Sequence, residues 1–148
     1  MKLSLKKVQI YPKLSEETNA FSAQLCLDGK PVAEVDNSGK GSSHGYRWLK
    51  PELRESIEAW ADAQPFEFVF ERLDQVVDRL LEDFEETRKL KMWCKTKTVY
   101  RLKDTPVGKW LIWDKPFTDA TKTRLVRQYG RLLGRVANEE LARKACTR

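Results

Sequence analysis

The sequence predicts an α+β fold in which an antiparallel sheet is covered by two helices and is followed by a basic hairpin and a carboxy-terminal helix. Three patterns support this class: apolar and polar residues alternate over 20–27, an Asp-Gly pair follows at 28–29, and an apolar stripe of helical period runs through 71–91. The chain has 148 residues, 41% of them hydrophobic, which is enough for one core, so we expect a single domain over 1–148.

The amino-terminal strands are expected at 3–10, 20–27 and 31–36. Along FSAQLCLD every second side chain is apolar, which is typical of a strand with one buried face. Asp28-Gly29 is a strong hairpin signal, because these residue types accept the positive φ angles of a two-residue turn. The pattern indicates an antiparallel meander, and its apolar face needs a cover.

The helices that provide this cover are expected at 51–63 and 71–91. Pro51 suits the first turn of the first helix, because an N–H group at that position has no partner within the helix. The second helix has the clearest period in the chain, with one apolar face formed by Leu73, Val76, Val77, Leu80, Leu81 and Phe84.

The second half of the chain predicts a hairpin, a helix, a short strand and a final helix. β-branched and aromatic residues at 96–102 and 109–114 flank the turn-rich segment DTPVG. Thr118 is expected to cap a helix that runs to Tyr129 and stops at Gly130. The strand LLGRV and a terminal helix that begins near Asn138 complete the domain.

Acidic and basic residues are distributed unevenly along the chain. Residues 1–86 contain 11 Lys/Arg and 17 Asp/Glu, a net charge of −6, whereas residues 87–148 contain 17 Lys/Arg and 5 Asp/Glu, a net charge of +12. A local excess of this size indicates that the carboxy-terminal half binds a polyanion.

The basic hairpin and the helix after it contain the candidate nucleic-acid-binding residues. Strand alternation in CKTKTVYRLK places several cations on one face, where they neutralise phosphates, and an exposed aromatic ring stacks on unpaired bases. The predicted interface consists of Lys95, Lys97, Arg101, Lys103, Lys109, Trp110, Lys122, Arg124, Arg127 and Arg131. The alternative is that the lysines keep an edge strand soluble.

Residues 36–46 read DNSGKGSSHGY and contain three of the seven glycines and the only histidine. They do not match the phosphate-binding pattern GxxxxGK[ST]. A looser anion site stays open, because glycine lets backbone N–H groups turn toward an oxyanion, and it would consist of Gly39, Lys40, Gly41, Ser42 and Ser43. The alternative is a connecting loop that needs glycine for its turns.

His44 lies beside two serines, but the sequence identifies no acid partner for a catalytic base. Cys26, Cys94 and Cys146 are far apart and lack the paired spacing of a zinc site. We therefore expect no enzyme activity, no metal and no cofactor, with an unrecognised active site near His44 as the alternative. The polar face of the 71–91 helix is interpreted as solvated, with a metal site or a docking surface as alternatives; its acids are Glu71, Asp74, Asp78, Glu82, Glu85 and Glu86.

The cellular location is predicted from two absences. No segment has the apolar length of a signal peptide or of a membrane span. The odd number of cysteines fits a reducing compartment better than a disulfide framework. We expect a cytoplasmic protein with no membrane partner.

Three segments carry a resemblance to known sequences: SEETNAFSAQLCLDGKPVAEVDNSGKGS at 15–42, CKTKTVYRLK at 94–103 and NEE at 138–140. In these segments the chain resembles a family of small uncharacterised proteins of bacterial genomes, bacteriophages and mobile elements. Members of that family tend to have an Asn-Asp-Gly-x-Gly-Gly loop, whereas residues 37–42 here read NSGKGS.

The resemblance implies an accessory role, because small proteins of phages and mobile elements often bind host or defence machinery. Together with the charge pattern, it predicts a non-enzymatic accessory protein that binds nucleic acid, or a ribonucleoprotein or protein complex, through its basic carboxy-terminal half. The alternative is an inhibitor that binds a host or defence protein complex.

Overall fold

The structure is a computed structural model, and it describes residues 1–66 and 68–146. The chain divides into two compact units, Met1–Asp83 and Phe84–Arg148, called here the amino-terminal unit and the carboxy-terminal unit. That the two units fold cooperatively as one domain over 1–148 stays a prediction.

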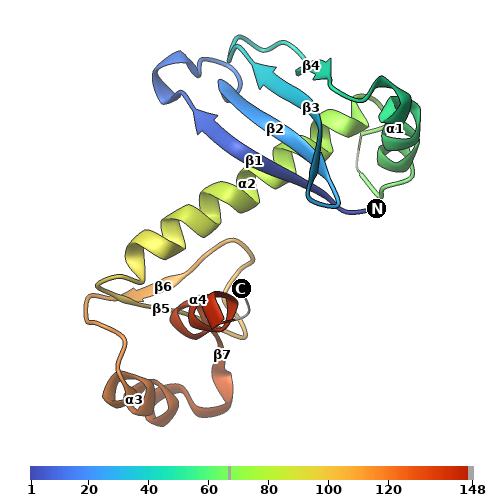
Figure 1. The fold of residues 1–148 in the computed structure, drawn as a ribbon. Coiled ribbons are helices and arrows are strands. Elements are labelled where there is room, and N and C mark those ends of the chain that lie inside the picture. The colour runs from blue at the N-terminus through green and yellow to red at the C-terminus, as the bar shows by residue number, and fades with distance from the viewer. Residues whose placement is uncertain (67, 147–148) are drawn as a thin grey trace. The chain divides into compact units, whose positions relative to one another are not determined.

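A four-stranded antiparallel sheet in the order β1-β2-β3-β4 forms the amino-terminal unit (Figure 1). Its strands are β1 (Leu3–Ile10), β2 (Phe21–Leu27), β3 (Lys30–Asn37) and β4 (Gly45–Trp48). The turn between β2 and β3 has φ angles of 48° at Asp28 and 81° at Gly29, as the Asp-Gly signal predicts. The pairing of β2 with β3 shifts between Leu25 and Cys26, where Val32 of β3 is the extra residue, and the side chains of Leu25 and Cys26 are both fully buried.

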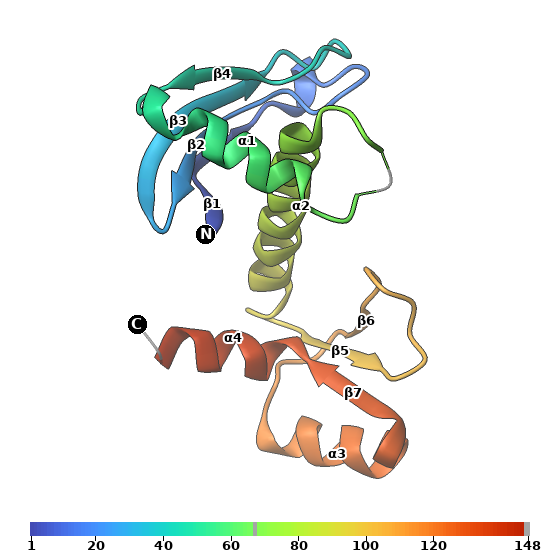
Figure 2. The same ribbon diagram turned by 90° about the vertical axis from the view of Figure 1, so that its right-hand side faces the viewer.

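Two helices lie on one face of this sheet (Figure 2). A short 3-10 turn (Pro51–Leu53) leads into α1 (Arg54–Asp62), and α2 extends over Arg72–Trp93. Most of the apolar stripe predicted for α2 packs in the core under the sheet, because its residues recur at the spacing of one helix face, whereas Phe84 at its end belongs to the carboxy-terminal unit. The helix residues buried in this core are Ile57, Ala61, Leu73, Val76, Val77 and Leu81.

The carboxy-terminal unit contains the last turns of α2 and a three-stranded antiparallel sheet in the order β6-β5-β7. Its further elements are β5 (Thr98–Leu102), β6 (Leu111–Trp113), α3 (Asp119–Tyr129), β7 (Leu133–Val136) and α4 (Ala137–Cys146). A small core forms where Leu125 of α3 packs on Tyr100 and Val136 of the sheet. The Asn138 side chain accepts the Val99 N–H at 2.8 Å and so ties α4 to β5.

The predicted fold class is confirmed: the chain is α+β, with a helix-covered antiparallel sheet, a second hairpin and a carboxy-terminal helix. Thr118 caps α3 through a capping box, and Gly130 ends it with φ 50°. Strand β4 was not predicted, because its four residues give too short an alternation to be recognised in the sequence. The helix expected from residue 51 also begins as a 3-10 turn.

Candidate nucleic-acid interface

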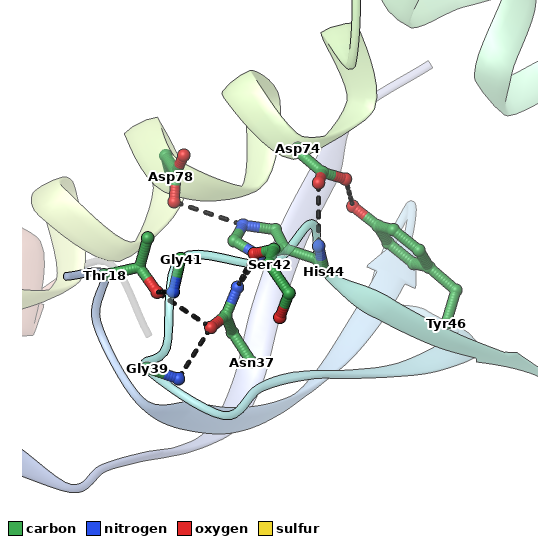
Figure 3. Close-up of polar contacts among 9 residues, drawn as sticks. All are labelled: Thr18, Asn37, Gly39, Gly41, Ser42, His44, Tyr46, Asp74 and Asp78. Atoms are coloured by element: carbon green, nitrogen blue, oxygen red, sulfur yellow. Dashed lines mark hydrogen bonds and ion pairs between the residues drawn. The ribbon is translucent and has the colours of Figure 1, made fainter. Parts of the chain in front are cut away.

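The glycine-rich loop between β3 and β4 is organised by the side chain of Asn37, which is 5% exposed (Figure 3). Its Oδ1 accepts the Gly39 N–H at 2.8 Å and the Thr18 hydroxyl at 3.0 Å. Its Nδ2 donates to the Ser42 carbonyl at 2.8 Å and to His44 Nδ1 at 2.9 Å. A single amide side chain therefore connects both ends of the loop.

Two acidic side chains of α2 hold the same loop from the helix side (Figure 3). Asp74 accepts the backbone N–H of His44 at 2.8 Å and the hydroxyl of Tyr46 at 2.7 Å. Asp78 accepts the Nε2–H of His44 at 3.1 Å. Burial, followed by the hydrogen bond and the charge of Asp74, raises the pKa of Tyr46 and favours the protonated hydroxyl that donates to Asp74.

The hydrogen bonds of His44 define its tautomer. Because Asn37 Oδ1 accepts a backbone N–H, its Nδ2 faces His44 and donates to Nδ1, so the ring proton is on Nε2 and points to Asp78. The His44 side chain is only 7% exposed. The Ser43 hydroxyl donates to Glu71 and not to His44. This geometry gives His44 a structural role in the loop, and an activity there stays a hypothesis.

The predicted anion-binding residues Gly39, Lys40, Gly41, Ser42 and Ser43 all lie in this loop. The amide of Gly39 donates to Asn37, and that of Gly41 donates to the Thr18 hydroxyl at 3.3 Å. The Glu17 carboxylate lies directly against Gly41, where it repels negative charge. Anion binding at the loop stays a prediction, and the function proposed below does not depend on it.

The cations of the basic hairpin lie mainly at the ends of the strands. Arg101 belongs to β5. The lysines predicted in this hairpin precede or follow the strands: Lys95, Lys97, Lys103 and Lys109. Lys97 pairs with Asp114, with Nζ and Oδ1 3.5 Å apart. Three predicted residues are exposed and form no ion pair within the described part of the chain: Lys95, Lys103 and Lys109.

Trp110 is half-buried and holds the positions of two arginines. The guanidinium carbons of Arg101 and Arg135 each lie 5.5 Å from the centre of the indole ring. The indole N–H donates to Glu86 at 2.8 Å. Arg101 also donates to two carbonyl groups of the turn that follows β5. Stacking of an unpaired base on Trp110 stays a prediction, and that base would have to share the ring with these guanidinium groups.

Helix α3 carries the clearest exposed cationic face of the carboxy-terminal unit. Leu125 is buried on its inner side, whereas Arg124 and Arg127 are exposed and lie three positions apart. The guanidinium carbon of Arg124 also lies 5.5 Å from the centre of the Trp113 ring of β6. Arg131 is exposed in the 3-10 turn that follows the helix. Lys122 differs from these residues because its ammonium group pairs with Glu139.

The residues that anchor the glycine-rich loop, and one of the two arginines at Trp110, were not predicted from the sequence. Asp74 lies 30 positions from His44 and 28 from Tyr46, so no local spacing predicts these contacts. Arg135 belongs to β7, which is not adjacent in sequence to Trp110. The positive charge of Arg135 was the only feature of the sequence that could have indicated this contact with Trp110.

Comparisons with family models, curated proteins and solved structures find no match to this chain. Among the described residues, no group of three or more His, Cys, Asp and Glu side chains is arranged to hold a metal ion. Within the same part of the chain, no helix combines the length and the apolar character that crossing a membrane requires.

Proposed function

We propose that this protein is a non-enzymatic accessory protein, of the phage or mobile-element type, whose carboxy-terminal unit binds nucleic acid or a nucleic-acid-containing complex through phosphate contacts. The observation that carries the proposal is the outer face of α3 with the turn after it. Arg124, Arg127 and Arg131 are exposed there and form no ion pair with described residues. Guanidinium groups at such positions bind phosphate oxygens in bidentate fashion.

The acids of the carboxy-terminal unit support this assignment because several are already paired within it. Asp114 pairs with Lys97, Glu139 with Lys122, and Glu140 with Arg135. Those acids therefore offset local cations and leave the arginines of α3 unbalanced. An uncompensated positive face attracts a polyanion and releases its counterions on binding.

The test compares two triple variants with the same change in net charge. Arg124→Glu, Arg127→Glu and Arg131→Glu together remove the proposed contacts. Lys13→Glu, Lys30→Glu and Lys50→Glu reverse three exposed lysines of the amino-terminal unit and provide the control. These six positions are all exposed, so both variants should fold.

Fluorescence anisotropy with labelled single-stranded and duplex oligonucleotides, at about 50 and about 200 mM salt, measures the effect. We expect the arginine variant to bind about tenfold or more weakly, with a logarithmic salt slope smaller by about 2 to 3. The lysine variant should change affinity by less than about threefold, because none of its three positions belongs to the proposed contacts. Equal losses in the two variants, or no binding of either oligonucleotide at low salt, would refute the proposal.

One observation favours the second candidate function, an inhibitor that binds a host or defence protein complex. Phe68, Val69 and Phe70 are 56%, 77% and 67% exposed in the segment before α2. Adjacent exposed apolar side chains of this kind mark protein-binding surfaces. If this function holds, Phe68→Ser with Phe70→Ser abolishes binding of a stoichiometric protein partner while the arginine variant retains it. Under the first proposal, the same double serine variant binds oligonucleotides normally.

A further inference from the structure

An open groove lies within the carboxy-terminal unit, between the last turns of α2 and α4. Its cavity volume is about 830 Å³. In both ribbon views α4 lies close to the carboxy-terminal end of α2 (Figures 1 and 2). The residues that line it are Thr87, Lys91, Cys94, Lys95, Phe117, Asn138, Leu141, Lys144 and Ala145.

The lining combines an apolar part with positive charge. Phe117, Leu141 and Cys94 are half-buried and supply apolar surface, including one aromatic ring. Lys91 belongs to the last turn of α2 and Lys95 to the turn that follows the helix, and both side chains line the groove. Lys144 adds a third positive charge from α4. A ligand that fits this lining has both an apolar body and a negative charge.

The volume and the chemistry together select a ligand class. Ligand sites typically occupy about 300 to 1,000 Å³, so the groove admits a group of nucleotide size. A free inorganic anion would leave the apolar surface of Phe117 and Leu141 uncovered. A nucleotide matches both features, because its base has an apolar π-face and its phosphate is anionic.

We propose that this groove binds an unpaired nucleotide of a single-stranded nucleic acid, with the base against Phe117 and Leu141 and the phosphates on Lys91 and Lys95. The proposal rests on the nucleic-acid-binding function proposed above and assigns a strand preference to it. A paired base cannot enter, because both of its faces are stacked in the duplex.

Base identity is expected to matter little. The amide of Asn138 is already engaged, since its Oδ1 accepts the Val99 N–H at 2.8 Å and its Nδ2 donates to the Lys97 carbonyl at 2.9 Å. Nδ2 also donates to the Cys94 carbonyl at 3.5 Å, so the amide has no free N–H with which to read a base edge. Stacking and phosphate contacts alone discriminate weakly among bases.

Cys94 provides a direct reporter of occupancy. Its thiol lines the groove and is half-buried, and burial raises its pKa, so alkylation proceeds slowly at neutral pH and is best followed at about pH 8.5. Cys26 is fully buried, and Cys146 is exposed. A Cys146→Ser variant therefore leaves Cys94 as the accessible thiol of the described chain.

The experiment measures the alkylation rate of Cys94 in the Cys146→Ser protein while anisotropy reports bound oligonucleotide in the same sample. The probes are a short oligothymidine, an abasic strand of the same length and a hairpin duplex. We expect oligothymidine at saturation to slow alkylation about fivefold or more, and the abasic strand and the duplex to slow it less than about twofold. Oligothymidine that binds at saturation without protecting Cys94 would overturn the groove assignment and leave the proposed function standing.

Binding of none of these probes would instead refute the proposed function, and this inference with it. Protection of Cys94 by an acidic peptide or a fatty acid, with none from oligothymidine, would also overturn the assignment. These outcomes separate a nucleotide site from other uses of an apolar, lysine-bearing groove.

Matched variants test the groove independently of Cys94. Lys91→Glu should weaken oligothymidine binding about fivefold more than Lys89→Glu, because both change the same charge on α2 but only Lys91 lines the groove. Ala145→Trp fills the groove, whereas Ala142→Trp places the same side chain on an exposed position of α4 outside it. Equal effects within either pair would contradict the proposal.

Discussion

Replacing Asn37 by alanine should destabilise the amino-terminal unit by about 2 to 4 kcal/mol. The side chain makes four hydrogen bonds, with donor–acceptor distances of 2.8 to 3.0 Å. Each contributes about 0.5 to 1.5 kcal/mol, and Asn37→Ala leaves the Gly39 N–H and the Ser42 carbonyl without these partners. Water enters part of the exposed loop in the variant and replaces some of these hydrogen bonds. The expected loss of stability is therefore smaller than the sum of the four largest contributions.

Urea unfolding followed by circular dichroism measures this change. With a slope of about 1 to 2 kcal/mol per molar urea, the midpoint should fall by about 1 to 4 M. Asn19→Ala is the control, because Asn19 is exposed near the same loop and has no hydrogen bond among the described contacts. A loss for Asn37→Ala within about 0.5 kcal/mol of that control would refute the role assigned to the amide.

Asn37→Asp tests the two donations from the amide nitrogen. The aspartate keeps the acceptor oxygen, but it loses both donations and places a carboxylate oxygen against His44 Nδ1. In the same urea measurement the variant should be at least as unstable as Asn37→Ala. A variant as stable as the native chain would contradict the donations assigned to the amide.

The remaining predictions concern packing, backbone conformation and one ion pair. Leu81→Ala should cost about 2 to 5 kcal/mol in urea unfolding, because the side chain is 2% exposed in the core under the sheet. Gly39→Ala should cost clearly more than Gly108→Ala in the same measurement: both have positive φ, but only at Gly39 would the new methyl group collide with backbone. Arg135 lowers the pKa of Glu140 in the folded state, so this pair stabilises the protein above the ordinary glutamate pKa and loses its effect as the pH falls through the lowered value. The stability difference between the native chain and Glu140→Gln should therefore shrink on acidification below about pH 4, and a constant difference would contradict this account.

The elements that the sequence predicted well depend on local physics. The Asp28-Gly29 turn, the Thr118 cap and the Gly130 stop involve residues that are neighbours in the chain, so residue type alone indicates the conformation. The apolar stripe of α2 is equally local, since the helical period places its side chains on one face before any partner is known. The uneven distribution of charge is also a property of the sequence, and it identified the carboxy-terminal half as the candidate interface.

Contacts between distant residues set the roles of the individual side chains. In the sequence, the acids of α2 form the pattern of a solvated helix face. In the structure, two of them, Asp74 and Asp78, hold a loop about thirty positions earlier in the chain. Trp110, which resembles an exposed stacking platform in the sequence, is half-buried and held against Arg101 and Arg135. The groove beside Cys94 arises only because α4 returns to the end of α2. Periodicity determines which face of a helix is polar, but the partner of that face depends on how the elements pack, because side chains far apart in sequence meet only in the folded chain.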